Sequence, residues 1–198
     1  LYLLLTIICA TLLYFSGMSI FDAICHSFTT LASGGYSTKN ASIAYWSSPL
    51  IHYIIIIFMI VAGTNFSLLY GAMIRKQGKR LIQDEEFRSY IYSILGVSLV
   101  VAAGLIFSRN FEGIKSVEIA FRDALFQIVA TMTTTGFSTS DYMSWHPILW
   151  LIILLIIPMG ATAGSTSGGI KIIRLHIITK NIFYEFKRVM HPKAIRPV

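Results

Sequence analysis

Two short segments rich in glycine, serine and threonine are the parts of this sequence best suited to binding chemistry. Their members are Ala32, Ser33, Gly34, Gly35 and Tyr36 in the first, and Thr133, Thr134, Thr135, Gly136 and Phe137 in the second. Small side chains let backbones approach closely, and rings of backbone carbonyl oxygens can replace the water shell of a cation. Gly35 and Gly136 can adopt the left-handed dihedral angles that aim neighbouring carbonyls inward. We therefore predict that both segments coordinate a cation through their backbones.

The two segments belong to an internal repeat with a constant offset of 101 residues. The offset superimposes flanking residues as well: Asp22 on Asp123, Ala23 on Ala124, Thr30 on Thr131, Ser37 on Ser138 and Thr38 on Thr139. A single segment of this kind is typical of an ordinary turn or a close helix contact. Two in the same register favour a shared function.

Each segment follows an apolar, helix-like piece, at Ile20–Leu31 and at Val117–Met132. A piece this short cannot span a bilayer, but it can re-enter the bilayer halfway. Asp22 and Asp123 lie near the predicted helix starts, where a carboxylate caps free N–H groups and meets the positive end of the helix dipole. The carboxyl end of each half-helix would point its partial negative charge at the glycine segment, which favours a cation.

A third constellation begins at Pro158, where an apolar stretch gives way to glycines and hydroxyl residues. These are Gly160, Gly164, Ser165, Thr166, Ser167, Gly168 and Gly169. Proline ends a helical hydrogen-bond ladder, so we predict a flexible loop over 158–169 that lies under the two glycine segments and gates them. A kinked helix packed through small residues is the alternative. Lys171 and Arg174 follow, and either face a cytoplasmic vestibule or an acidic partner, or simply anchor the chain.

The composition places these segments in a membrane protein. The 198 residues are 55% hydrophobic and 13% charged, with a mean hydropathy of +0.69, against about 25% charged in an ordinary soluble domain. This excludes a disordered chain, a coiled coil and a disulfide scaffold, and argues against a soluble enzyme. The two cysteines have no metal-ligand spacing. Basic helix ends account for the net charge of +7, so we expect a lipid bilayer and no nucleic acid as partner.

Four stretches are apolar enough to cross a bilayer, or nearly so. They are Leu1–Phe15, Leu50–Met73, Tyr90–Phe107, and a last one that begins at Ile148, breaks at Pro158 and resumes at Ile170. Pro49 and Pro147 suit a first helical turn, and Asn65 is expected to hydrogen-bond a neighbouring helix. Basic residues gather in 75–88 and 171–198, which places both in the cytoplasm and the glycine segments outside.

We therefore expect an all-α integral membrane protein in which one unit occurs twice: helix, re-entrant pore helix with filter, helix. The boundaries are 1–74 for the first unit, 75–88 for a cytoplasmic linker, 89–184 for the second unit and 185–198 for a basic cytoplasmic segment. The last helix of the second unit is broken by the loop. The chain starts inside an apolar stretch without the basic region of a signal peptide, so we expect a piece of a longer protein.

Three motifs in this order resemble the Trk/Ktr/HKT superfamily of potassium transporters: FDAICHSFTTLASGGYSTKNAS, ATMTTTGFSTSDY and GATAGSTSGGIKIIRL. The resemblance covers nearly the whole chain and is greatest to the membrane subunit of bacterial Trk-type uptake systems. It implies four repeats around one pseudo-fourfold, potassium-channel-like pore, with this chain similar to repeats two and three. It also implies that Gly35 and Gly136 are filter glycines. The carbonyl groups that would bind K⁺ are those of Ser33, Gly34, Thr134 and Thr135.

The resemblance further implies a function and partners for the complete protein. It would take up K⁺ across the bacterial inner membrane, with 158–169 as an intramembrane gating loop and with neither an organic cofactor nor enzymatic activity. It would form a homodimer and bind a cytosolic, nucleotide-binding regulatory ring, for which 75–88 and 180–198 are candidate contacts. Repeats one and four are missing here, so this chain alone should not conduct.

Two other functions stay open from the residues themselves. A secondary transporter could bind a small solute at unwound helices near the midplane, although it would not explain two matched half-helices. An intramembrane hydrolase could use Ser165 or Ser167 as its nucleophile, although His176 has no evident role as the base. His26, within the first half-helix, is expected to be a packing residue.

Overall fold

The structure, a computed structural model, describes residues 1–75, 77–109 and 114–190 and is mainly helical over these ranges. The elements in chain order are α1 (Tyr2–Phe15), α2 (Ile20–Leu31), a 3-10 helix (Ser42–Tyr45), α3 (Pro49–Ala62), α4 (Phe66–Met73), α5 (Gly78–Gln83), α6 (Glu85–Arg109), α7 (Ile114–Met132), a 3-10 helix (Tyr142–Ser144), α8 (Pro147–Ile156) and α9 (Ile172–Met190). Extended pairing within the described ranges is limited to one bridge, between Met159 and Ile170.

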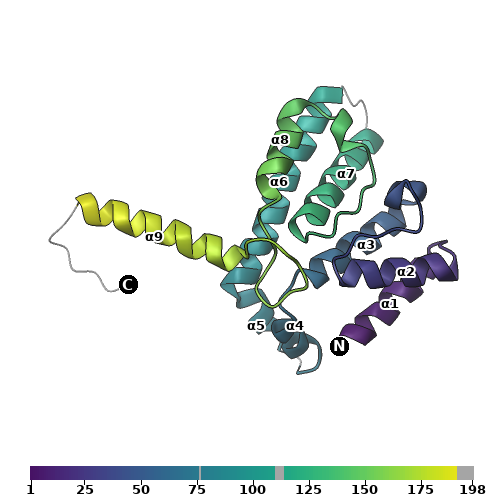
Figure 1. The fold of residues 1–198 in the computed structure, drawn as a ribbon, viewed down its shortest axis with the longest axis horizontal. Coiled ribbons are helices and arrows are strands. Elements are labelled where there is room, and N and C mark those ends of the chain that lie inside the picture. Colours follow the sequence, from purple (N-terminus) through teal and green to yellow (C-terminus); the bar gives the residue numbers. More distant parts are fainter. Residues whose placement is uncertain (76, 110–113, 191–198) are drawn as a thin grey trace.

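Helix α3 lies between two groups of helices. It packs against α1 and α2 on one side and against α7 on the other, and α7 packs in turn against α6 and α8. Figure 1 shows the first group in purple and blue, the second in teal and green, and α9 extending away from both. Because α2 and α7 each end at a glycine segment, this arrangement brings the two segments toward one centre.

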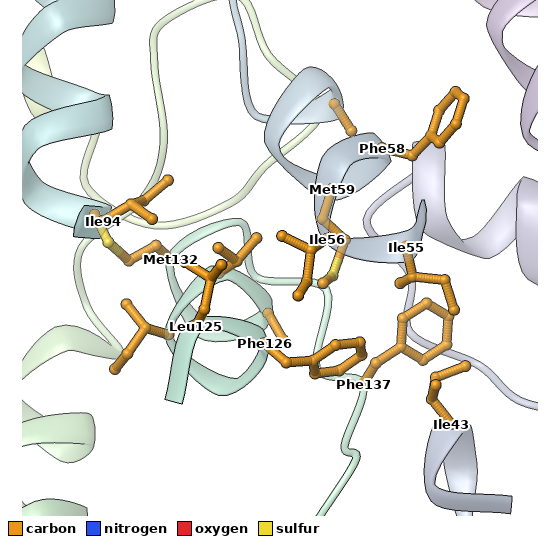
Figure 2. Packing of buried hydrophobic residues seen from close by; sticks show 14 of the residues in the cluster. Ile43, Ile55, Ile56, Phe58, Met59, Ile94, Leu125, Phe126, Met132 and Phe137 are labelled. Atoms are coloured by element: carbon orange, nitrogen blue, oxygen red, sulfur yellow. The ribbon is translucent and has the colours of Figure 1, made fainter. Parts of the chain in front are cut away.

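Apolar side chains fill the space between α3 and α7. Figure 2 shows Ile56 and Met59 of α3 near Phe126 of α7, and Phe137, from the second glycine segment, beside Ile55. Each of these five side chains is at most 2% exposed. Protein interiors are packed as densely as organic crystals, so this core fixes the position of the second glycine segment.

Several predicted helix boundaries are confirmed. Helix α2 spans Ile20–Leu31 as predicted. Pro49 and Pro147 occupy the first turns of α3 and α8, where a missing amide proton costs nothing. Helix α7 ends at Met132 as predicted but begins at Ile114, three residues before the predicted start.

The predicted span over Leu50–Met73 is not one helix. Helix α3 ends at Ala62, α4 begins at Phe66, and the two are bent by 108°. Asn65 caps α4 by accepting from two amides of its first turn (2.9 and 3.4 Å). The prediction that Asn65 bonds a neighbouring helix is therefore wrong, because a helix start offers unpaired amides to such a side chain.

By length and composition, one helix of the described chain is suited to cross a bilayer, at Glu85–Ser108. The bent pair α3–α4 adds a second if it counts as one span, and α1 and α8 are apolar but shorter. The predicted loop 158–169 lies between α8 and α9, which are separate helices. Helix α9 covers the start of the predicted basic segment, at 185–190, and residues 191–198 lie outside the described ranges.

Candidate functional site

The first glycine segment (32–36) and the second glycine segment (133–137) share one backbone hydrogen-bond pattern. In each, three successive amides turn back and donate to carbonyl groups in the last turn of the preceding helix. The bonds are Ser33 to Thr30 (3.2 Å), Gly34 and Gly35 to Thr29 (2.8 and 3.4 Å), Thr134 to Thr131 (3.0 Å), and Thr135 and Gly136 to Ala130 (2.9 and 3.1 Å). The offset of 101 therefore relates the conformations of the two segments as well as their sequences.

Both segments also hold two residues in the left-handed region at matched positions. The φ angle is +53° at Ser33 and +66° at Gly35, and +54° at Thr134 and +81° at Gly136. Glycine adopts this region freely, whereas a side chain raises its cost by roughly 1–2 kcal/mol. Ser33 and Thr134 are therefore held there by their surroundings, as happens where a site is preorganised.

The carbonyl oxygens of the two segments have no hydrogen-bond donor among the residues that the structure describes, at any position of 32–36 or 133–137. Ala32, Gly34, Tyr36 and Gly136 are exposed, so their carbonyl groups lie in residues that this chain leaves uncovered. The residues that the structure describes contain no group of three or more His, Cys, Asp or Glu side chains that could hold a metal ion. Backbone oxygens without a donor are groups that can replace the water shell of a cation.

The two glycine segments lie against each other. A Cβ atom at Gly35 would overlap the carbonyl oxygen of Thr135, so this approach requires glycine. Beyond the segments, the Ser138 carbonyl accepts from the Ala44 amide (3.1 Å), and the Ser138 amide donates to the Ser42 hydroxyl (3.3 Å). The two segments that sequence analysis related only by register are thus in contact, although through other residues than the pairs given by the offset of 101.

Polar side chains of α2 hold the chain that follows the first glycine segment. His26 is fully buried, with Nδ1 2.7 Å from the Asp22 carbonyl and Nε2 2.9 Å from the Ser37 hydroxyl. A carbonyl can only accept, so Nδ1 carries a proton, and in the neutral ring Nε2 accepts from the Ser37 hydroxyl. The Asp22 carboxylate accepts from the Thr38 hydroxyl (2.5 Å) and pairs with Lys39 (3.7 Å). His26 thus does more than the packing that the sequence predicted.

The two aspartates differ in their roles. The Thr38 hydrogen bond lowers the pKa of Asp22 and keeps its carboxylate charged. Asp22 lies in the first turn of α2, whose N-cap is Ser19, with the Ser19 hydroxyl accepting from the Asp22 amide (3.1 Å). Asp123 lies in the middle of α7, so the prediction that it caps a helix start is wrong. Residues 114–122 contain neither proline nor glycine, and they extend the helix ahead of it.

The matched aromatic residues of the two segments also differ. Tyr36 is 79% exposed, whereas Phe137 is 1% exposed and has its ring centre 5.9 Å from that of His26. Phe137 therefore packs the second glycine segment onto residues of the first half of the chain. No sequence signal separates these two positions, because both carry an aromatic residue at the same place in the repeat.

The connecting segment (157–171), between α8 and α9, is a loop closed at its base. The Gly160 amide donates to the Ile170 carbonyl and the Ile170 amide to the Pro158 carbonyl, each at 2.8 Å. A Cβ atom at Gly160 would overlap the Gly168 carbonyl oxygen, and Gly169 has a φ of +71°. The glycines of the predicted loop thus allow its two ends to meet.

The connecting segment contacts both glycine segments. The Thr166 hydroxyl lies 2.9 Å from the Ser33 hydroxyl, and the Gly168 amide donates to the Thr134 hydroxyl (2.7 Å). Ser33 and Thr134 are the matched residues with left-handed backbones. The segment therefore meets the two glycine segments at equivalent positions.

The same segment accounts for the break between α3 and α4. The amide and hydroxyl of Thr162 donate to the Gly63 carbonyl (3.1 and 2.9 Å), and those of Thr166 donate to the Ala62 carbonyl (3.3 and 3.2 Å). The last carbonyls of a helix have no partner within the helix, and here residues about 100 positions later supply one. A local sequence window contains no such information.

Two charged residues support the connecting segment. The Glu86 carboxylate accepts from the Ala163 amide (2.6 Å), a contact that sequence analysis missed. Lys171 donates to the Ser167 carbonyl and to the hydroxyls of Ser165 (3.4 Å) and Ser167 (3.1 Å). Lys171 also interacts electrostatically with Glu86. It therefore binds its own loop and lies near an acidic residue, which was one of the roles that sequence analysis left open beside a vestibule and an anchor.

Comparison with known proteins gives a consistent family. A family model described as "TrkH: Cation transport protein" matches residues 1–198. The chain is 39% identical over 194 residues to the Trk system potassium uptake protein TrkH of Salmonella typhimurium, with 98% of this chain and 40% of that protein covered. It is 34% identical over 197 residues to the Trk system potassium uptake protein TrkG of Escherichia coli, with 100% and 40% covered.

A solved structure agrees with these relatives. The crystal structure of the potassium transporter TrkH from Vibrio parahaemolyticus superimposes with a TM-score of 0.93 at 37% sequence identity, covering 99% of this chain and 42% of that one. The chain spans about 40% of the length of the curated relatives it matches.

Proposed function

The chain belongs to the TrkH family of cation transport proteins, and on this premise we propose that it forms part of a pore for K⁺ uptake. The observation that carries the proposal is the matched pair of glycine segments. They share their hydrogen bonds and left-handed positions, and their carbonyl oxygens have no partner among the described residues. Such oxygens can replace the water lost by an alkali cation.

In the proposed filter, K⁺ is the transported ion and meets only backbone oxygens. The carbonyls that we assign to it are those of Ser33, Gly34, Thr134 and Thr135, flanked by Ala32, Tyr36, Thr133 and Phe137. Gly35 and Gly136 permit the backbone path. Because the chain spans about 40% of its relatives, we propose that further repeats of the complete protein supply the rest of the carbonyl ring.

We propose that the connecting segment (157–171) gates this pore. It is bonded to Ser33 and Thr134, directly beside the carbonyls assigned to the ion, so it would obstruct the path in the conformation seen here. Its bonds to Ala62 and Gly63 would have to break before it could move aside. A gate of this kind would act without any change in the filter itself.

We further propose an orientation and partners for the complete protein. It would be a multi-pass protein of the bacterial inner membrane, with the glycine segments open to the outside and with 75–88 and the end of the chain in the cytoplasm, following the distribution of Lys and Arg. A homodimer and a cytosolic, nucleotide-binding regulatory ring would complete the system, with 75–88 and 180–198 as candidate contacts.

The experiment uses the complete protein in proteoliposomes and compares K⁺ with Na⁺ uptake. Gly35→Ser and Gly136→Ser should each lower the K⁺/Na⁺ ratio, because a side chain disfavours the left-handed backbone that aims the carbonyls. Gly96→Ser, in α6, is the matched control, since a Cβ atom there meets no described atom within 4 Å. Unchanged ratios in both filter variants would overturn the assignment.

A further inference from the structure

The connecting segment is bonded to one ionised acceptor among the residues that the structure describes. Besides the Ile157 and Met159 amides, which donate back into α8, four of its amides donate to groups outside the segment: Thr162 to Gly63, Thr166 to Ala62, Gly168 to Thr134 and Ala163 to Glu86. The first two acceptors are carbonyls and the third is a hydroxyl. The Glu86 carboxylate is charged, and its bond of 2.6 Å has the length expected of a charge-assisted hydrogen bond.

The ammonium group of Lys171 binds the same segment a few residues after Ala163. Lys171 donates to Ser165 and Ser167, which follow Ala163 by two and four residues. Glu86 and Lys171 also interact electrostatically. Residues 163–167 are thus bonded to a carboxylate at their start and to an ammonium group at their end, and this pairing favours one placement of the segment.

Glu86 is fixed relative to the linker that precedes it. It is the second residue of α6, and Asp84 caps this helix by accepting from the Phe87 amide (2.9 Å) while its carbonyl accepts from Arg88 (3.1 Å). Helix α5 ends directly before this cap, at Gln83. Asp84 therefore joins the end of α5 to the start of α6, one residue before Glu85 and two before Glu86.

We propose that Glu86 is a positioning residue that holds the connecting segment docked against the glycine segments and links that docking to the position of the α5–α6 linker. The role in transport rests on the proposed function of the segment as a gate. The positional role does not, because it concerns only where the segment lies. Glu86 touches neither glycine segment and acts through the Ala163 amide.

The test measures hydrogen exchange at the Ala163 amide, by mass spectrometry of the complete protein in detergent, together with basal Rb⁺ uptake in proteoliposomes. Glu86→Ala should speed exchange of this amide by about tenfold, as expected when a hydrogen bond to a charged group is lost, and should raise basal uptake. Glu86→Gln keeps an acceptor oxygen and should retain most of the protection.

Glu85→Ala is the matched control. Glu85 is the neighbouring carboxylate, its side chain is 79% exposed, and it pairs at 3.8 Å with Lys180. Because 75–88 and 180–198 are the proposed contacts of the regulatory ring, the comparison uses the protein without that ring, where exchange and uptake should both stay as in the unchanged protein. If Glu86→Ala does not accumulate, Glu86→Asp shortens the reach of the carboxylate by one methylene group and should also speed the exchange.

The outcomes separate the two proposals. Unchanged exchange at Ala163 in the Glu86 variants would overturn the positioning role. Faster exchange with unchanged uptake would support that role and contradict the gate. Faster exchange with increased uptake would support both.

Discussion

The carbonyl oxygen of Thr135 occupies the space that a Cβ atom of Gly35 would need. The two residues are 100 positions apart in the sequence, and each belongs to one of the matched glycine segments. The contact is one-sided, because a Cβ atom at Gly136, the counterpart of Gly35, meets no described atom within 4 Å. Two glycines that are equivalent in the repeat are therefore unequal in their surroundings.

This difference predicts an order of sensitivity among glycine variants. Gly35→Ala adds backbone overlap to the left-handed φ of +66° and should reduce K⁺ uptake by the complete protein at least tenfold. Gly136→Ala carries only the conformational cost of roughly 1–2 kcal/mol and should be less impaired. Gly34→Ala is the control, since its Cβ would meet Tyr36 at an ordinary 3.5 Å. Equal losses in all three variants would contradict the geometry.

The bonded ring of His26 predicts a second effect, on selectivity. His26→Phe keeps an aromatic ring in the buried site but loses the acceptor for Ser37, so the chain after the first glycine segment should loosen and the K⁺/Na⁺ uptake ratio should fall. His26→Gln should rescue part of the ratio, because glutamine can accept the bond and is the residue at the matched position 127. A double-mutant cycle with Ser37→Ala measures the coupling, about 1 kcal/mol for one hydrogen bond. Additive losses would show that the two residues act independently.

Sequence periodicity and register were enough to predict that the two glycine segments are equivalent in their local structure. The offset of 101 relates the hydrogen bonds that follow Thr29 to those that follow Ala130, because equivalent residues after equivalent helix ends make equivalent local bonds. Helix α2 and the prolines at helix starts also follow from local rules. What these predictions share is that the interacting groups lie within a few residues of one another.

The features that sequence analysis missed depend on distant groups. The break after Ala62 forms where Thr162 and Thr166 supply donors to the end of α3, and the Glu86 contact joins residues 77 positions apart. Tyr36 and Phe137 have equivalent sequence contexts but differ in exposure because only Phe137 meets the core beside α3. Tertiary packing decides such positions, and a single sequence does not contain it in readable form.

The contact of the connecting segment with Thr134 predicts a third effect, on leakage. Thr134→Val removes the acceptor for the Gly168 amide but leaves the Thr134 carbonyl and the side-chain shape in place. Basal Rb⁺ uptake into proteoliposomes should rise, by up to about tenfold for one lost hydrogen bond, with the K⁺/Na⁺ ratio unchanged. Thr131→Val is the control, because among the described residues the Thr131 hydroxyl donates to the Gln127 carbonyl of its own helix (2.7 Å) and to no part of the connecting segment. A fall in selectivity without leakage would place Thr134 in the filter alone.

The Asp22 carboxylate predicts a fourth effect, on pH dependence. Its pKa is lowered, chiefly by the Thr38 hydroxyl, so its stabilising contribution is present above the usual pKa of about 3.9 and is lost as the pH falls through the lowered value. The thermal stability of the complete protein should therefore decline on acidification below about pH 4, and less so in Asp22→Asn. Thr38→Val removes the hydrogen bond that lowers the pKa of Asp22. The loss of stability that Asp22 causes should therefore begin at a higher pH in this variant. Identical pH profiles for all three proteins would exclude Asp22 as the titrating group.

The unequal burial of the matched aromatic residues predicts a fifth effect, on stability. Phe137→Ala opens a cavity in the core between α3 and α7, where the side chain is 1% exposed, and truncations of buried phenylalanine cost about 3–5 kcal/mol in soluble proteins. Tyr36→Ala removes a side chain that is 79% exposed and should change the unfolding midpoint of the complete protein far less. Since both residues flank equivalent carbonyls, the comparison separates core packing from a filter role. If the two variants lost equal stability, Tyr36 would have to be packed by parts of the complete protein outside this chain. The difference in exposure between Tyr36 and Phe137 would then not hold in the complete protein.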